Sequence, residues 1–462
     1  MEPAVPTVLI RGGTLVHPES TQRADLLCVG EKIQAIGENF DAPEEATVID
    51  ASGCFVLPGL VDPHVHAWLP TADVCGKSDY ATMGRAAAVG GTTTFLDMCG
   101  PTRQQLPREG FDAWLEKAEG QCCCDWSVHL TVSRFDVDAQ RQIREIVAEG
   151  VTSFKVYLAY PGVLALEDGE LFDALGLACE LGVRVCAHCE DPVLIERMQR
   201  TLLAAGKTSP RWHAPSRPPL VEALGVRKLG LMAHLQNASL YLVHVSSAEA
   251  LRAALELREA GVDLAVECLV NHLLLDESLT QSDELEAAKY IMSPPLRPKA
   301  DQDTLWQALQ AGQVQTIGTD DAAFNFSGQK DRGRDDFTRI PSGIPSVEHR
   351  LDLLHTHGVL AGRIDWPRLV RLTSTEPARL FGLYPQKGYL AEGSDADVVV
   401  YDPNLTHTLS VKTHHMPVDY SAYEGWTVRG HARHVLRRGE FLVRGGAFVG
   451  HPTGRFLRRP YP

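Results

Sequence analysis

The two ends of the chain share a pattern of short apolar runs that alternate with polar positions and are broken by glycine-rich turns. This pattern occupies residues 1–55 and returns near the end, at 397–401 and 440–446. Short alternating runs between tight turns are typical of β-strands. Because the same pattern flanks one long middle segment, we expect a smaller β-sandwich domain that is formed by both chain ends.

The middle of the chain alternates short β-rich runs with longer amphipathic stretches, which is typical of βα units around a parallel sheet. The clearest helical stretches are 138–149, 170–181, 247–260 and 301–311. The predicted strands are 60–66, 92–98, 126–132, 152–159, 183–188, 239–245, 263–268 and 314–320. Eight βα units predict an α/β fold of the (β/α)8 TIM barrel type. An open doubly wound sheet is the alternative, but no Gly-x-Gly-x-x-Gly turn follows the first strand to support it.

These patterns divide the chain into three parts. Residues 1–55 form the N-terminal part of the β-sandwich domain, 56–384 form the barrel, and 385–462 form the C-terminal part of the β-sandwich domain and a tail. A length of 462 residues is sufficient for one large domain and a smaller one. The Gly/Arg/Asp-rich stretch 327–339 is expected to be a mobile loop rather than a linker.

Composition and charge narrow the class of partner. Hydrophobic residues make up 44% of the chain and charged residues 22%, as in ordinary globular proteins. The net charge of −15 argues against nucleic acid or an anionic membrane as a partner, because both require concentrated Lys and Arg. No apolar run reaches the ~20 residues that span a bilayer, and the first residues lack the features of a secretory leader. Eleven cysteines, three of them consecutive at 122–124, fit free thiols in the cytoplasm better than a disulfide framework.

Candidate metal ligands lie at the C-terminal ends of the predicted barrel strands, where TIM-barrel active sites are found. The first strand ends in His64-Val65-His66, and residues two apart on a strand point to the same side, so both imidazoles can reach one ion. Later strands end at His188, His244 and Asp320. A lone histidine at a strand end is more often a hydrogen-bonded structural residue, so it is the grouping of these donors that indicates a metal centre.

Lys155 lies in the fourth predicted strand between the apolar residues Phe154 and Val156. Removing an unpaired charged amine from water costs several kcal/mol, so burial favours its neutral form. Strand position alone does not explain why a lysine stands there.

In their local contexts these residues resemble the cyclic amidohydrolase branch of the amidohydrolase superfamily, and within it the dihydropyrimidinase and hydantoinase group. The resemblance extends along nearly the whole chain. The segments that carry it are 53–66, 153–160, 293–297 and 454–459.

The resemblance implies two divalent metal ions and a Lys155 that is carboxylated by CO2, because a carbamate is an anion that bridges two metals whereas an ammonium is not. Zinc is the default metal for histidine and carboxylate ligands, and manganese or cobalt is compatible with them. The implied ligands are His64, His66 and Asp320 for one ion, His188 and His244 for the other, and Lys155 as the bridge.

By the same resemblance, the chain is a hydrolase that opens a cyclic amide or ureide ring, a dihydropyrimidine or a 5-substituted hydantoin, to an N-carbamoyl amino acid. The implied nucleophile is a hydroxide between the metals, since metal binding lowers the pKa of water towards ~7. Asp320 would pass its proton to the departing ring nitrogen, and Tyr160 would donate a hydrogen bond to the developing oxyanion. Ser293 matches a serine that binds the ureide edge, whereas Ser342 stands where we expect Asn. The resemblance also implies a homotetramer or homodimer.

Two further positions depart from the expected family pattern. Asp191 stands where Asn is common, and Asp321 replaces a usual His or Asn beside Asp320. A second carboxylate can raise the pKa of its neighbour. Adjacent residues on a strand point apart, however, so we expect Asp321 to have a loop or helix-start role.

Three residues or motifs resemble ligands without fitting the metal centre. Cys186 and Cys189 have Cys-x-x-Cys spacing, but no second cysteine pair follows at zinc-finger spacing. His129 and His272 lie near the ends of two other strands, and we expect both to be structural because the six implied ligands already fill two metal sites.

Three other functions compete with this prediction. An allantoinase-type ureide hydrolase remains the main alternative, because the ligand set does not distinguish related ureide rings. A dihydroorotase would use an Arg two residues beyond the second His, but that position is Trp68, whose indole cannot make a charge-assisted bond to a carboxylate. Non-catalytic relatives of dihydropyrimidinase serve as interaction proteins after losing metal ligands, and this chain retains all six.

Overall fold

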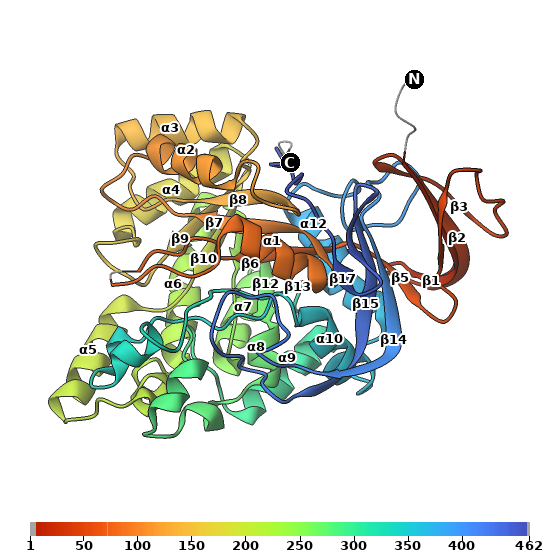
Figure 1. The fold of residues 1–462 in the computed structure, drawn as a ribbon. Coiled ribbons are helices and arrows are strands. Elements are labelled where there is room, and N and C mark those ends of the chain that lie inside the picture. The colour runs from red at the N-terminus through yellow and green to blue at the C-terminus, as the bar shows by residue number, and fades with distance from the viewer. Residues whose placement is uncertain (1–5, 72, 460–462) are drawn as a thin grey trace.

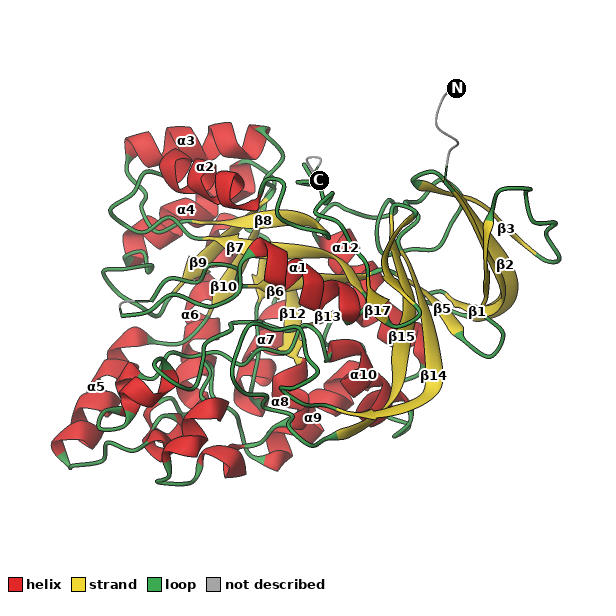
Figure 2. Cartoon of the chain, viewed as in Figure 1, coloured by secondary structure: helices red, strands yellow, loops and turns green. Residues whose placement is uncertain are grey.

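The computed structural model describes residues 6–71 and 73–459 of the chain. An eight-stranded parallel barrel lies beside a nine-stranded, mostly antiparallel sheet, and helices surround the barrel (Figures 1 and 2). The predicted fold class is therefore confirmed. Among the described residues, no helix is long and apolar enough to cross a membrane.

Each strand of the barrel pairs with the next strand in the chain. Apart from Arg184, every residue of these strands is buried, because one face points into the barrel and the other packs against helices. Each predicted strand overlaps an observed one. The strands are β6 (Leu60–Val65), β7 (Thr92–Cys99), β8 (Asp125–Thr131), β9 (Ser153–Tyr157), β10 (Arg184–His188), β11 (Leu240–Leu242), β12 (Leu264–Leu269) and β13 (Thr316–Gly318).

The barrel closes between its first and last strands. Val65 forms an isolated parallel bridge with Asp321. The backbone N–H of Asp320 donates to the carbonyl of His64 at 2.9 Å, and the N–H of His66 donates to the carbonyl of Asp321 at 3.0 Å. We call these contacts the closing seam; they involve the backbone of three candidate metal ligands.

The helices follow the predicted amphipathic stretches. Those stretches correspond to α3 (Val137–Ala148), α4 (Asp168–Glu180), α7 (Ala248–Glu259) and α9 (Lys299–Gln310). Asp136 and Ser247 cap the starts of α3 and α7 by accepting hydrogen bonds from backbone N–H groups in the first turn. The other helices are α1 (Tyr80–Val89), α2 (Pro107–Ala118), α5 (Pro192–Ala204), α6 (Pro219–Gln236), α8 (Val270–Leu274), α10 (Arg350–Leu354), α11 (Trp366–Val370) and α12 (Glu376–Leu380).

The second sheet is built from both ends of the chain, as the blue and red strands in Figure 1 show. β14 (Val398–Thr408) pairs antiparallel with β5 (Phe55–Pro58). The hydrophobic core of the sheet includes Ile10 and Val56 from the N-terminal part and Val400 from the C-terminal part. The domain boundaries at 55–56 and 384–385 stay a prediction. The strands of this sheet are β1 (Thr7–Val16), β2 (Thr21–Val29), β3 (Lys32–Gly37), β4 (Thr47–Asp50), β5 (Phe55–Pro58), β14 (Val398–Thr408), β15 (Thr427–Arg437), β16 (Glu440–Arg444) and β17 (Ala447–Phe448).

Candidate metal centre

Three of the candidate ligands meet directly at the C-terminal end of the barrel. Potential ligand atoms of His64, His66 and Asp320 all lie within 4.8 Å of one another. One oxygen of Asp320, Oδ1, is 3.1 Å from Nε2 of His64 and 2.9 Å from Nε2 of His66. All three residues are at least 92% buried. This arrangement matches the first predicted ligand group.

The other three candidates adjoin this group. The ring of His244 is 4.6 Å from that of His188 and 5.5 Å from that of His64. Lys155 is buried in β9, and its charge is close enough to both of these second-group histidines to contribute to lowering their pKa values. The six predicted ligands are thus neighbours in space, although they come from five strands.

The protonation states of the donors suit a cation. Burial lowers the pKa of His66, His188 and His244, which keeps these imidazoles neutral and able to bind metal. Burial likewise lowers the pKa of Lys155, which favours an uncharged amine.

His64 shows most clearly that the charges at this site suit a cation. Burial lowers its pKa, but the carboxylates of Asp320 and Glu267 outweigh burial and raise that pKa to about 9. Its Nε2 is buried and faces Oδ1 of Asp320, the carboxylate oxygen that Nε2 of His66 also faces. A metal ion at this nitrogen would replace the proton and satisfy the two carboxylates. The donor set therefore fits a metal centre.

Glu267 on β12 orients two of the candidate ligands and was not identified from the sequence. Its Oε1 lies 2.8 Å from Nδ1 of His64 and accepts a hydrogen bond from the backbone N–H of His244 at 2.8 Å. Tyr241 donates its hydroxyl to the other oxygen of Glu267 at 2.8 Å. The contact between Glu267 and His64 makes Nδ1 the protonated nitrogen of His64 and turns its Nε2 towards the site. An acid in an otherwise apolar strand was the signal that could have identified it.

Glu190 plays the same part for His188. Its Oε2 lies 2.8 Å from Nε2 of His188 and accepts a hydrogen bond from Arg217 at 2.6 Å. Burial raises the pKa of Glu190, but Arg217 and His188 outweigh burial and lower that pKa to about 2. Because the carboxylate occupies Nε2, Nδ1 of His188 is the nitrogen that remains for a metal ion.

The backbone is strained at this end of the barrel. Tyr160, His244 and Asp320 have φ angles of 67°, 44° and 49°, in the left-handed region that favours glycine. Such residues cost of order 1–3 kcal/mol each and gather at functional sites. Here they turn the chain sharply just after three strands end.

The three candidate substrate-binding residues form one connected group. The side chain of Tyr160 is hydrogen-bonded to Ser293 and to Arg217, and its ring lies 5.7 Å from that of His188. The hydroxyls of Ser293 and Ser342 are 3.1 Å apart. Burial raises the pKa of Tyr160, so its hydroxyl stays protonated and able to donate.

The two departures in sequence have structural roles. The carboxylate of Asp321 accepts hydrogen bonds from the backbone N–H groups of Ser346 and Val347 at 2.7 and 2.9 Å. It therefore anchors a loop, in agreement with the expectation from strand alternation. Asp191 caps the start of α5 by accepting a hydrogen bond from the N–H of Leu194 at 2.9 Å.

The remaining candidates also make structural contacts. His129 lies between the hydroxyl of Ser153 at 2.7 Å and the carbonyl of Pro63 at 2.9 Å. His272 donates to the carbonyl of Pro294 at 3.1 Å. All eleven cysteines are free thiols, Cys186 and Cys189 among them.

Comparison with known proteins adds an independent line of argument. The model of the amidohydrolase family matches residues 55–442. The D-hydantoinase of Geobacillus stearothermophilus is 42% identical over 98% of this chain and 96% of its own length. The solved structure of D-hydantoinase (dihydropyrimidinase) from Thermus sp. has a TM-score of 0.96 and 46% identity, and covers 98% of this chain and 99% of that one. The L-hydantoinase (dihydropyrimidinase) from Arthrobacter aurescens gives a TM-score of 0.89 and 27% identity, with 98% and 100% coverage.

Proposed function

The chain belongs to the amidohydrolase family, and from that premise we propose that it hydrolyses 5-substituted hydantoins, with preference for the D-enantiomer. Its likeness to hydantoinases over almost the whole length makes it a hydrolase of cyclic amides. The preference for D-substrates rests on higher identity to proteins named D-hydantoinase, 42% and 46%, than to the L-hydantoinase, 27%. The same relatives disfavour an allantoinase-type activity.

Members of this family bind divalent metal, and we propose two sites here. Zinc is the default ion, with manganese or cobalt compatible. Three observations support the proposal: the convergence of His64, His66 and Asp320, the neutral histidines around them, and the buried amine of Lys155. An uncharged amine is the form that reacts with CO2, so the low pKa of Lys155 favours its carboxylation. The proposed ligands are His64, His66 and Asp320, then His188 and His244, with carboxylated Lys155 between the two groups.

The bound metals would supply an activated water and polarise the ring carbonyl. Asp320 then serves first as the general base and afterwards as the general acid. Burial raises its pKa, but His64 and His66 outweigh burial and hold that pKa well below its usual value, so the carboxylate starts unprotonated. It accepts the proton of the attacking water and returns the proton to the departing ring nitrogen.

Tyr160 and the two serines position the ring. Tyr160 donates a hydrogen bond from its hydroxyl to the carbonyl oxygen as negative charge develops there. Ser293, hydrogen-bonded to Tyr160, and Ser342 beside it bind the ureide edge of the ring together with their main chain. One observation carries the whole proposal: Tyr160, Ser293 and Ser342 adjoin the candidate metal ligands at the same end of the barrel.

A turnover panel tests the substrate class. Purified protein loaded with zinc or manganese in bicarbonate is assayed on D- and L-5-substituted hydantoins, dihydrouracil, allantoin and dihydroorotate. We expect hydantoins and dihydrouracil to be opened, D-hydantoins faster than L-hydantoins, and dihydroorotate not to react. Faster hydrolysis of allantoin than of every hydantoin, or comparable turnover of dihydroorotate, would overturn the assignment.

We also propose that the chain works as a homotetramer or homodimer in the cytoplasm. Helix α6 leaves a row of leucines exposed along one side. An apolar face of this kind on a folded protein marks an interaction surface. The residues of this leucine face are Leu220, Leu224, Leu231 and Leu235. The free cysteines support a reducing compartment.

A further inference from the structure

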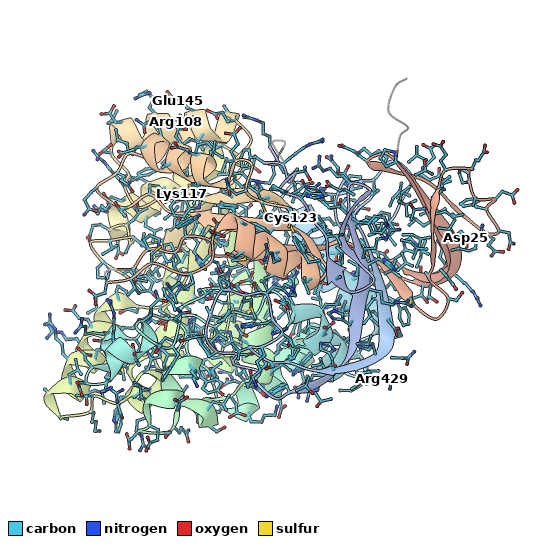
Figure 3. The ribbon with its side chains drawn as sticks, in the orientation of Figure 1. Asp25, Arg108, Lys117, Cys123, Glu145 and Arg429 are labelled. Atoms are coloured by element: carbon cyan, nitrogen blue, oxygen red, sulfur yellow. The ribbon has the colours of Figure 1, made fainter. Side chains whose placement is uncertain are left out.

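A second group of metal-ligand side chains lies where the C-terminal strands pack against helix α10. Asp352 belongs to α10, His407 to β14 and His431 to β15. Arg429, which Figure 3 labels at the lower right on the blue strands, precedes His431 by two residues on β15. The carbonyl of Arg429 lies 2.6 Å from Nδ1 of His355, just beyond α10, so the two elements are in contact here.

The potential ligand atoms of these three side chains lie close together. Oδ2 of Asp352 is 2.9 Å from Nδ1 of His431 and 3.4 Å from Nε2 of His407, and the three atoms lie within 4.8 Å of one another. The two imidazole rings are 4.9 Å apart. Ligands held at about 2.0–2.2 Å around a tetrahedral zinc ion lie roughly 3.3–3.6 Å apart. The 3.4 Å distance already lies in this range, and the 2.9 Å distance is about 0.4 Å short of it, so small side-chain movements would seat an ion.

The surroundings prepare the carboxylate for this role. Tyr401 donates its hydroxyl to Oδ1 of Asp352 at 3.1 Å, which leaves Oδ2 for the two histidines. A hydrogen bond of this kind orients a ligating carboxylate. The Asp352 side chain is 6% exposed, whereas those of His407 and His431 are 28% and 24% exposed, so an ion can enter from solvent.

We propose that Asp352, His407 and His431 bind a third divalent transition-metal ion, such as Zn²⁺, with water completing its coordination. Two histidines and one carboxylate are ligands that zinc accepts. The site joins the second sheet to α10, the helix that also carries Arg350, whose guanidinium lies 3.5 Å from Asp62 in the first barrel strand. The ion is therefore structural: it ties the C-terminal strands to the barrel. This proposal does not depend on the proposed function.

The test counts bound zinc in the full-length protein after equilibration with Zn²⁺ and gel filtration. The double variant H407N/H431N keeps amide groups that can donate to Asp352 but removes both imidazole ligands. We expect it to hold one zinc ion fewer per chain than the wild type, to hydrolyse substrate at the wild-type rate, and to lose part of the zinc-dependent rise in melting temperature. H451N, at an exposed histidine outside the cluster, should match the wild type.

Equal zinc content in the wild type and H407N/H431N would overturn the proposal and leave Asp352 and His431 as a simple ion pair. If the double variant does not fold, the single variant H407N carries the same comparison, because it removes the more exposed ligand. An inactive wild type would count against the proposed function, but the difference in zinc content between wild type and variant would still decide this site.

Discussion

Lys330 is a fully buried lysine whose amine joins the two segments that carry the proposed ureide-binding serines. Its Nζ donates to the carbonyls of Ile291 and Pro341 at 3.0 and 2.9 Å. Burial lowers its pKa from 10.5 to about 7. A neutral amine has two N–H donors, which equals the number of carbonyls that it contacts.

This pKa predicts how stability depends on pH. Between about pH 7 and 10.5 the unfolded chain binds a proton at Lys330 that the folded chain has released, so the free energy of unfolding rises with pH. The slope reaches about 1.4 kcal/mol per pH unit, and the whole window amounts to about 5 kcal/mol as an order of magnitude. Below pH 7 both states are protonated, and the folded protein bears the full cost of a buried charge.

The substitution K330M should remove this pH dependence. It also leaves the carbonyl of Pro341 without its donor, at a pH-independent cost of about 1–3 kcal/mol. Urea unfolding of the metal-loaded wild type and K330M, monitored at several pH values from 6.5 to 10, measures both effects. The free energy of unfolding of the wild type, relative to that of K330M, should be lowest near pH 7 and should be several kcal/mol higher by pH 10.

K412M is the matched control, since Lys412 is exposed. Its unfolding free energy should follow that of the wild type at every pH. If K330M keeps the same pH slope as the wild type, then Lys330 is charged in the folded protein across this range, and the reasoning from burial is refuted.

Three further predictions concern the proposed metal centre and the leucine face. K155A should abolish hydrolysis, and added acetate or propionate should restore part of it in place of the carbamate; full activity in K155A would refute the bridging role. E190Q should lower activity and metal affinity about 10–100-fold, because the amide no longer holds His188 as a carboxylate does, whereas E196Q, at an exposed position on α5, should not; equal activities would contradict an orienting role. L231E/L235E should shift the protein to a smaller assembly in size-exclusion chromatography with light scattering, and an unchanged mass would exclude the leucine face as the interface.

Much of the fold could be predicted from local patterns. The barrel strands are short apolar runs bounded by turns, so their positions are visible without any knowledge of tertiary contacts. The candidate ligands could be found for the same reason, because a parallel barrel brings every strand end to one face. Lys155 needed the family resemblance, since a buried lysine has no unique role on physical grounds.

Contacts between distant segments could not be predicted. Glu267 and His64 are separated by 203 positions, and no local pattern relates them. The cluster of Asp352, His407 and His431 is equally scattered and does not lie at strand ends of the barrel. Pairing of this kind depends on tertiary structure, which a single sequence does not display.

The stretch 327–339 has more local structure than its composition indicates. Its mobility stays a prediction, but the loop contains the short 310 helices η5 (Lys330–Gly333) and η6 (Phe337–Arg339). Lys330 and Phe337 are 0% exposed. Gly333 is needed for this packing, because a Cβ there would lie 2.0 Å from a side-chain carbon of Ile340. Gly333 thus permits close contact between the two 310 helices and the chain that follows them.

The closing seam also sets an order of events during synthesis. His64 and His66 leave the ribosome early, whereas Asp320 follows only after all eight barrel strands have been made. Domains generally fold as units during synthesis, and the proposed first ion has no complete set of ligands until the last strand joins the first. A chain that ends before Asp320 therefore cannot assemble this proposed site. Uptake of the proposed first ion would then be a late event that marks a finished barrel.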